Sequence, residues 1–254
     1  MNFLRLHDLD FADDESRLKF HKNILISKPI LKTLFTDMNF FTHSQINKHI
    51  KTDLSRALEI GSGVHPFTSE MCEVITSDLA FNPELNLVVD AQNLCIKHNS
   101  LDLVIGQFVF HHFSDPVGAL NELNKVLTKG ALLVLIEPAN TILGKILFPV
   151  MHKSEYYDTT ADWRNQSRGT MENANQALSY IYFNRDKERF IQEFQDYEIL
   201  EDSLLIPFGL RYIASGGLNF RQLLPDFMFN SVLKFLDKRF NFFAVHWIII
   251  LRKK

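Results

Sequence analysis

The most constraining feature of this chain is a series of short, largely apolar runs, each followed by a glycine, an acid or an amide. The runs cover residues 57–60, 73–77, 85–89, 101–105 and 132–136. The last run is almost unbroken, which is typical of a strand buried on both faces of a sheet. Because helices or short crossovers separate the runs, we expect an α/β fold with a mostly parallel sheet and helices on both faces.

One helix is predicted clearly, between the fourth and fifth of these strands. Apolar residues recur at helical spacing over 117–127. Ser114 or Asp115 can cap its start, and Gly130 is expected to close its end.

The polar residues that follow the strands define the predicted ligand site. In open α/β sheets, ligands bind outside the carboxyl ends of the strands. The residues expected at this edge are Gly61, Asp78, Asp90, Gln107 and Glu137.

The composition is that of an ordinary globular protein. The 254 residues carry a formal net charge of −3, so there is no global basic field and no nucleic-acid partner is expected. Two cysteines, Cys72 and Cys95, exclude a disulfide scaffold and favour a cytoplasmic location. The 23 phenylalanines indicate a Phe-rich core, an apolar acceptor pocket or a membrane-facing patch.

The first strand ends in Glu59-Ile60-Gly61-Ser62-Gly63, where glycines let a ligand approach the backbone closely. A nicotinamide-dinucleotide site would need a third glycine, and this chain has Pro66 at that position. A nicotinamide-dependent oxidoreductase is therefore the weaker alternative.

Taken in order, residues 57–138 resemble class I S-adenosylmethionine-dependent methyltransferases of the type 11-like group. The matching motifs are Glu59-x-Gly61-x-Gly63, Asp78, Asp90-Ala91, the run 101–104 leading to His111-His112, and Glu137-Pro138. The resemblance implies a Rossmann-like fold with a seven-stranded sheet, methyl transfer as the activity and S-adenosylmethionine as the cofactor. Segments 152–158, 174–178, 183–186 and 215–217 are similar to one bacterial branch of this fold, associated with modification of surface polysaccharides or related small molecules.

The resemblance also implies roles for single residues. Asp78 would accept hydrogen bonds from the ribose hydroxyls, and Asp90 would accept one from the adenine amino group. Glu59 would order the loop or meet the methionyl amine through water. The full set of predicted cofactor-binding residues is Glu59, Gly61, Ser62, Gly63, Asp78, Leu79, Asp90, Ala91, Gln92 and Gln107.

The candidate catalytic residues are His111, His112 and His152. Adjacent residues on a regular element do not face one ligand, so His111 and His112 do not predict a metal site. One of them is a candidate base, because histidine titrates near neutral pH, and the alternative is that His112 only shapes the loop. His65 stands where the family often has a third glycine, which leaves a cofactor-binding protein without catalysis as a second alternative.

The acceptor, expected to be a small molecule or glycan-linked, would bind after the fifth strand. The polar and aromatic candidates there are His152, Glu155, Tyr156, Tyr157 and Asp158. Arg168 and Arg211 could bind an anionic acceptor, or they could form ordinary ion pairs on the surface. Trp163 is expected to be a packing anchor.

Residues 1–52 are predicted as a helical appendage or lid, with one helix starting near Pro29. The resemblance implies that residues 53–254 form the methyltransferase domain, with its cofactor half at 53–138 and acceptor-side insertions at 139–195 and 209–240. Residues 186–194 are expected to be helical, and 199–206 and 243–251 to be strands. The amphipathic stretch 227–240 either packs on the core or makes a peripheral membrane contact through an apolar face flanked by Lys234, Lys238 and Arg239.

Overall fold

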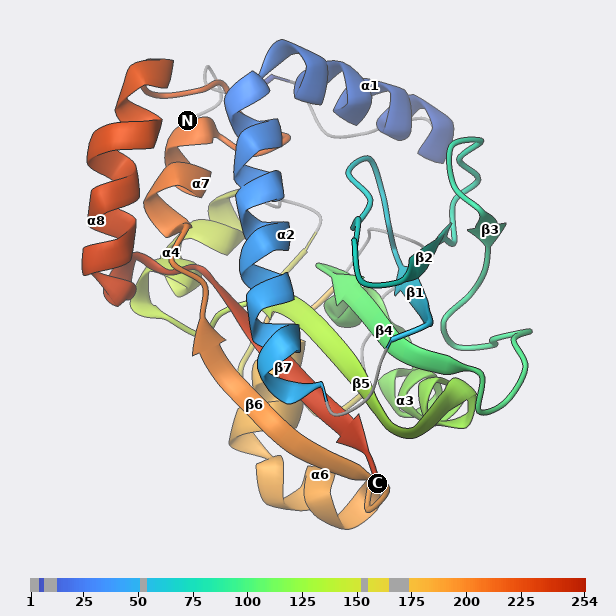
Figure 1. Ribbon diagram of the computed structural model, residues 1–254. Coiled ribbons are helices and arrows are strands. Elements are labelled where there is room, and N and C mark those ends of the chain that lie inside the picture. The colour runs from blue at the N-terminus through green and yellow to red at the C-terminus, as the bar shows by residue number, and fades with distance from the viewer. Residues whose placement is uncertain (1–4, 7–12, 51–53, 152–154, 165–173) are drawn as a thin grey trace.

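The computed structural model describes residues 5–6, 13–50, 54–151, 155–164 and 174–254, and one seven-stranded sheet forms its centre (Figure 1). The strand order is β3-β2-β1-β4-β5-β7-β6. The strands are β1 (Arg56–Ile60), β2 (Glu73–Asp78), β3 (Leu87–Val88), β4 (Leu101–Gln107), β5 (Leu127–Pro138), β6 (Tyr197–Leu205) and β7 (His246–Lys253). β7 runs antiparallel to both of its neighbours, and the other described pairings are parallel. The predicted α/β fold with a mostly parallel, Rossmann-like sheet is confirmed.

The centre of the sheet contains the switch point of the topology. β1 lies between β2 and β4. On one side the sheet continues from β2 to β3, and on the other side it continues from β4 to β5. Ile60 pairs with Gly106, so the loops that follow β1 and β4 begin side by side. A crevice opens at such a point in α/β sheets, and ligands bind there.

The α-helices of the described residues are α1 (Asp14–Ser27), α2 (Pro29–His49), α3 (Pro116–Val126), α4 (Ile142–Met151), α5 (Leu178–Tyr180), α6 (Lys187–Glu193), α7 (Gly209–Ser215) and α8 (Lys234–Arg239). Short 3-10 turns lie at Phe110–His112, Asp226–Met228 and Asn241–Phe243. Single π-helical turns lie at Ile181–Arg185 and Phe229–Leu233.

Two apolar clusters cover the two faces of the sheet. On one face, Leu34 and Met38 of α2 belong to the same cluster as Leu103 of β4. On the other face, Leu120 of α3 belongs to the same cluster as Val104. Successive strand residues point to opposite faces, so β4 is buried on both sides, as its apolar run predicts. Figure 1 shows α2 crossing the front of the sheet, so the N-terminal helices share a core with the strands.

The helix after β4 starts as predicted but ends earlier. Asp115 caps α3 by accepting a hydrogen bond from the N–H of Gly118 at 3.0 Å. The prediction that Gly130 closes this helix is wrong. Leu127 already has an extended backbone and pairs with Leu101, and Gly130, with φ +84°, lies inside β5 next to a register shift. The glycine therefore serves an irregular strand start.

The remaining predicted elements are found in the structure, except that one strand is shorter and one predicted amphipathic stretch is broken into several turns. β6 and β7 occur close to the predicted ranges 199–206 and 243–251, α6 lies within 186–194, and α2 starts at Pro29. The third predicted strand, 85–89, is reduced to Leu87–Val88. The stretch 227–240 is not one amphipathic helix, because 3-10 and π turns precede the short α8.

Candidate active site

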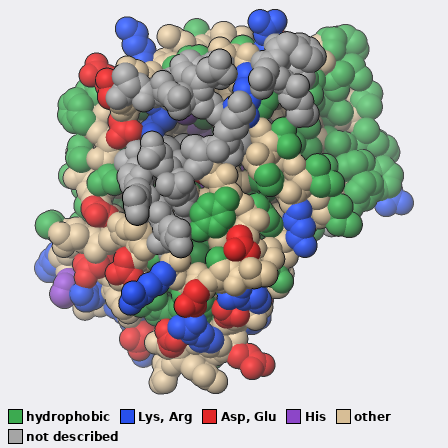
Figure 2. Space-filling model, turned by 180° about the vertical axis from the view of Figure 1, so that it is seen from behind, with side chains coloured by type: hydrophobic (Ala, Val, Ile, Leu, Met, Phe, Trp, Pro, Cys, Tyr) green, Lys and Arg blue, Asp and Glu red, His purple; other side chains and the backbone are tan. Residues whose placement is uncertain are grey.

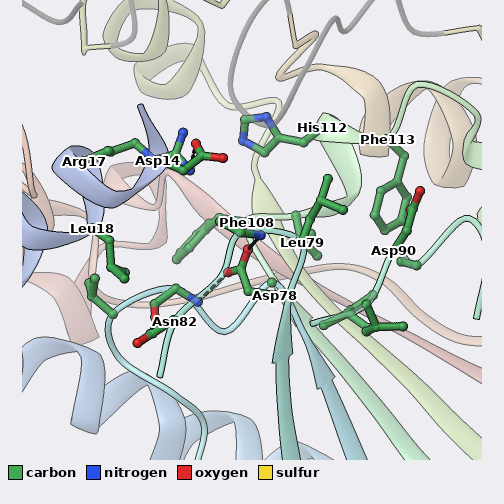
Figure 3. Close-up of a pocket in the computed structure, with 18 of the residues that line it drawn as sticks. Asp14, Arg17, Leu18, Asp78, Leu79, Asn82, Asp90, Phe108, His112 and Phe113 are labelled. Atoms are coloured by element: carbon green, nitrogen blue, oxygen red, sulfur yellow. Dashed lines mark hydrogen bonds and ion pairs between the residues drawn. The ribbon is translucent and has the colours of Figure 1, made fainter. Parts of the chain in front are cut away.

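A cavity of about 410 Å³ opens at the carboxyl edge of β1, β2 and β4. This volume is within the range of small-molecule and cofactor sites. Figure 3 shows Asp78 on one side of the cavity, with Asp14 and Arg17 of α1 and His112 across from it. The predicted cofactor residues that line it are Gly61, Gly63, Asp78, Leu79, Asp90, Ala91 and Gln92.

The two glycines after β1 have a backbone conformation that favours glycine. Gly61 has φ +67°, and a Cβ atom there would lie 2.7 Å from Cγ2 of Val109. Gly63 has φ +55°, and no atom would lie within 4 Å of its Cβ. Gly61 therefore allows close packing against the loop after β4, and Gly63 leaves the cavity open.

Asp78 holds this loop with the carboxylate that also faces the cavity. Its Oδ2 accepts a hydrogen bond from the N–H of Gly63 at 2.9 Å, and its Oδ1 accepts one from the N–H of Ala80 at 3.0 Å. Each carboxylate oxygen can accept more than one hydrogen bond, so both oxygens retain capacity for ligand hydroxyls.

Asp90 provides a second carboxylate in the cavity, in the part that is lined by the loop after β3. Its Oδ1 accepts hydrogen bonds from the N–H of Gln92 at 2.8 Å and from Nε2 of Gln92 at 3.3 Å. Oε1 of Gln92 in turn accepts from Oγ of Ser114 and from the N–H of Asp115. This network fixes the loop after β3 against the start of α3.

Three predicted cofactor residues lie behind the glycine loop rather than on the cavity wall. Glu59 is buried, and its carboxylate accepts hydrogen bonds from the N–H of Phe67 at 2.9 Å and from Nε2 of Gln107 at 3.1 Å. Burial raises the pKa of Glu59 to about 7, against the opposing effect of these hydrogen bonds. Oγ of Ser62 accepts from the N–H of Ser77 and so ties the loop to β2. Glu59 thus bonds to the backbone beyond the glycine loop at Phe67. Its loop-ordering role, and direct contact of Glu59, Ser62 and Gln107 with a cofactor, stay predictions.

His111 is buried between two carboxylates. Its Nδ1 lies 2.6 Å from Oε2 of Glu137, and its Nε2 lies 3.8 Å from Oε2 of Glu155. Burial opposes the charged ring, but the carboxylates outweigh it and raise the pKa of His111. Glu137 also accepts hydrogen bonds from the N–H groups of Val109 and Phe110, so it fixes both the histidine and the loop.

The two adjacent histidines do come together, contrary to the prediction from a regular element. They lie in a single 3-10 turn, and their ring centroids are 4.2 Å apart. Together with Glu155 they offer ligand atoms within 4.8 Å of one another. Ligand atoms around a tetrahedral ion lie about 3.3 Å apart for bonds of about 2.05 Å, and Nε2 of His111 lies farther than this, at 3.8 Å, from Oε2 of Glu155.

A smaller cavity of about 160 Å³ adjoins the first. His112, Phe108, His21 and Leu218 line both, so the two cavities share a wall. The remaining lining of the smaller cavity is aromatic and polar and includes Phe35, His111, Pro138, Phe148, Glu155, Gln176, Tyr212, Asn219 and His246. His112 thus lies between a larger cavity with two carboxylates and a smaller, mostly apolar one.

The other acceptor-side candidates have structural contacts. Arg211 is buried against Asp37 and Asp237, and Trp163 is buried and donates from Nε1 to Asp186 at 2.8 Å, as expected of a packing anchor. The remaining ones, Tyr156, Tyr157 and Asp158, are absent from the described lining of both cavities, and His152 and Arg168 lie outside the described residues.

Sequence reasoning gave residues 1–52 as a helical appendage or lid but named no residue of α1 as part of the site. Asp14, Arg17, Leu18 and His21 line the larger cavity, and Asp14 pairs with Arg17 at 2.8 Å. Their spacing of three, four and seven residues places them on one helix face, and this is the signal that could have found them. Phe108 was also missed, and its φ of +56° marks a strained backbone at the end of β4.

His65 does not obstruct the cavity. Its ring lies 5.4 Å from that of Phe35 on α2, and it lines a separate hollow with Lys32, Thr36 and other α2 residues. The replacement of the family's third glycine therefore leaves the larger cavity open.

Comparison with known proteins agrees with this geometry. Residues 58–135 match the family model described as a methyltransferase domain. The matched segment includes the glycine loop, Asp78, Asp90 and both adjacent histidines, and it ends before α4. The cofactor expected from the sequence, S-adenosylmethionine, agrees with this match.

Three solved structures are similar to this chain at low sequence identity, and the first of them shares the fold. A putative methyltransferase from an antibiotic biosynthesis pathway of Anabaena variabilis is 14% identical, with 84% of this chain and 96% of that chain covered and a TM-score of 0.50. The plantazolicin methyltransferase BpumL, solved in complex with SAH, is 14% identical, with coverage of 96% and 92% and a TM-score of 0.48. The YcgJ protein of Bacillus subtilis is 16% identical, with coverage of 84% and 98% and a TM-score of 0.46. No curated protein matches the chain.

Proposed function

We propose that this protein transfers a methyl group from S-adenosylmethionine to a small-molecule or glycan-linked acceptor. The observation that carries the proposal is the larger cavity, where Gly63, Asp78 and Asp90 of the matched segment meet at the switch point of the sheet. When bound, S-adenosylmethionine supplies an activated methyl group on a sulfonium sulfur.

The residues present fit the parts of this cofactor. Asp78 retains acceptor capacity for the ribose hydroxyls, and Asp90 with Ala91 and Leu79 offers a polar group beside an apolar wall for the adenine. The backbone at Gly63 leaves room for the methionyl part. Leu18 and Phe108, drawn on one side of the cavity in Figure 3, would exclude water from the reacting centre.

His112 is the candidate base. It borders both cavities, so it would lie between a cofactor bound in the larger cavity and an acceptor bound in the smaller one. The His111 ring lies beside it at a tilt of 41° and is fixed by Glu137, so the pair has a defined orientation. An acceptor hydroxyl would lose its proton to His112, whereas an amine would need only to be positioned.

The described helices include none whose length and apolarity would suffice to cross a bilayer. A cytoplasmic location, suggested by the two free cysteines Cys72 and Cys95, stays a prediction.

Calorimetric titration with S-adenosylmethionine and S-adenosylhomocysteine tests the proposal. We expect binding by the wild type, and Asp78→Ala should weaken it by about 2–4 kcal/mol through the loss of two charge-assisted hydrogen bonds. Asp202→Ala is the matched control, because Asp202 lies in β6 and lines neither cavity. Binding of NADH without binding of either sulfur compound would support the oxidoreductase alternative instead.

A further inference from the structure

One side of the molecule exposes large apolar side chains from α4 and from the turns around α8. The five largest contributions are Ile142 at 81% exposure, Ile146 at 65%, Phe227 at 76%, Phe235 at 66% and Phe242 at 65%. Figure 2 shows an extended hydrophobic area on this side, where the view of Figure 1 has α4 and α8. We call these five residues the α4–α8 surface.

The two parts of this surface belong together. The turn Asn241–Phe243, which carries Phe242, contacts both α4 and α8. Monomeric proteins rarely expose contiguous apolar areas of this kind without a partner. The stretch 227–240 thus has two apolar sides. Phe229 and Leu233 face the core and are buried, whereas Phe227 and Phe235 are exposed.

The charge around the α4–α8 surface is basic. Lys145 of α4 and Lys238 and Arg239 of α8 are exposed. In residues 142–151 and 223–243 the acids are Asp226, which is exposed, and Asp237, which is buried against Arg211. An apolar face bordered by Lys and Arg is the arrangement by which helices bind the interface of anionic membranes. A two-fold contact between copies of this chain would instead bring these like charges together.

α4 joins this surface to the acceptor side of the proposed active site. Phe148 is buried and lines the smaller cavity, whereas Ile142 and Ile146 of the same helix point outward. Tyr212 of α7, the helix that packs against α8, also lines this cavity. One helix thus has one side on the acceptor cavity and another on the apolar surface.

We propose that the α4–α8 surface docks on an anionic lipid membrane and that the acceptor is lipid-linked, presented to the smaller cavity at the membrane interface. The docking rests only on the exposed residues of the α4–α8 surface. The lipid-linked acceptor also rests on the proposed methyl transfer. The volume of about 160 Å³ suits a compact portion of the acceptor rather than a whole acyl chain.

Co-sedimentation of the full chain with vesicles tests the docking. The vesicles contain phosphatidylcholine alone or with phosphatidylglycerol. We expect binding to the anionic vesicles that weakens as salt is raised. The double variant Phe235→Ser/Phe242→Ser should lower partitioning about 100-fold, since burial of one Phe is worth about tenfold or more. Lys145→Gln/Lys238→Gln should lower it about 30-fold on anionic vesicles only, at about 1 kcal/mol per charge.

Phe40→Ser is the matched control, because Phe40 is 69% exposed but lies on α2, away from the surface. Its partitioning should equal that of the wild type. Absence of vesicle binding, or equal loss in Phe40→Ser, would overturn the docking. So would a stable dimer that Phe235→Ser/Phe242→Ser dissociates, because the surface would then be an interface between copies. Calorimetric binding of S-adenosylmethionine by the same samples separates this failure from a failure of the proposed function.

Discussion

Oδ2 of Asp78 accepts a hydrogen bond from the N–H of Gly63 at 2.9 Å, although the two residues are 15 positions apart in the chain. The bond fixes the loop after β1 to the end of β2, and both residues line the larger cavity. The acid expected to bind the ribose therefore also shapes the backbone expected to run beside the cofactor.

The first prediction concerns Gly63→Val. The side chain would project into open space at the cavity, and φ of +55° would be strained for valine. We expect S-adenosylmethionine binding to weaken at least about tenfold, together with a loss of about 1–2 kcal/mol in unfolding free energy. Calorimetry and urea denaturation measure the two effects.

Gly130→Val provides the matched control for this prediction. Gly130 also has a positive φ, +84°, with nothing within 4 Å of its Cβ, but it lies in the first part of β5, outside the described lining of both cavities. It should lose similar stability and keep cofactor affinity. Equal losses of affinity in both variants would show that strain, rather than occupation of the cavity, is responsible.

The second prediction concerns the pH dependence due to Glu59. Burial raises its pKa from an ordinary 4.5 to about 7. As pH rises from 4.5 to about 7, the unfolded chain loses this proton first, so the folded state binds more protons and its stability falls. Above about 7 the effect is complete. The change amounts to about 3 kcal/mol, at about 1.36 kcal/mol per pH unit.

Urea denaturation of the wild type and Glu59→Gln across this range checks the prediction. The difference in unfolding free energy should move in favour of the variant as pH rises, because glutamine does not titrate. Glu84→Gln, at an acid whose side chain is 71% exposed, should follow the wild type. A wild type and Glu59→Gln that stay parallel from pH 4.5 to 7.5 would rule out the raised pKa.

The sequence predicted the sheet and much of the cavity because both depend on local patterns. Apolar runs specify strands, and a parallel arrangement brings Gly61, Asp78 and Asp90 to one edge whatever the rest of the chain does. The resemblance to methyltransferases covers the same residues. It therefore suggested roles for side chains that the sheet pattern had already predicted to lie at one edge.

The sequence did not predict features that depend on how distant segments pack. Asp14 and Arg17 enter the cavity because α1 docks across the sheet edge, and their local sequence specifies a helix but not its position. Gly130 resembles a helix stop in sequence, yet pairing with β4 extends β5 back to Leu127. His111 and His112 come together because the chain makes a tight turn there instead of a regular element.

The third prediction concerns Lys28→Met. Nζ of this buried lysine donates hydrogen bonds to the carbonyl oxygens of Ser215 at 3.1 Å, Gly217 at 2.8 Å and Phe220. Methionine would fill the space but leave these carbonyls without their donor. We expect a loss of about 2–3 kcal/mol in unfolding free energy by urea denaturation. Lys32→Met, at an exposed position of α2, should change stability by less than about 0.5 kcal/mol, and a similar loss there would contradict the role of the buried ammonium.

The last prediction concerns Glu137→Gln. Burial alone would favour a neutral His111, and the carboxylates of Glu137 and Glu155 reverse this and raise its pKa. The charged pair therefore stabilises the fold below the unfolded histidine pKa of about 6.5, and this stability is lost as pH rises through the folded value. Glu137→Gln keeps an acceptor for the N–H groups of Val109 and Phe110 but removes the nearer charge.

Proton NMR titration of the histidine rings measures this change directly. In the wild type, we expect the pKa of His111 to lie above the ordinary histidine value, and in Glu137→Gln this pKa should fall, because the nearer carboxylate is removed. His65, whose pKa is lowered by burial and whose ring lies against that of Phe35, provides an internal reference that should titrate alike in both proteins. If His111 titrated identically in both proteins, Glu137 would act on the loop after β4 only through its backbone hydrogen bonds, and the orientation of His112 would not depend on a charged neighbour.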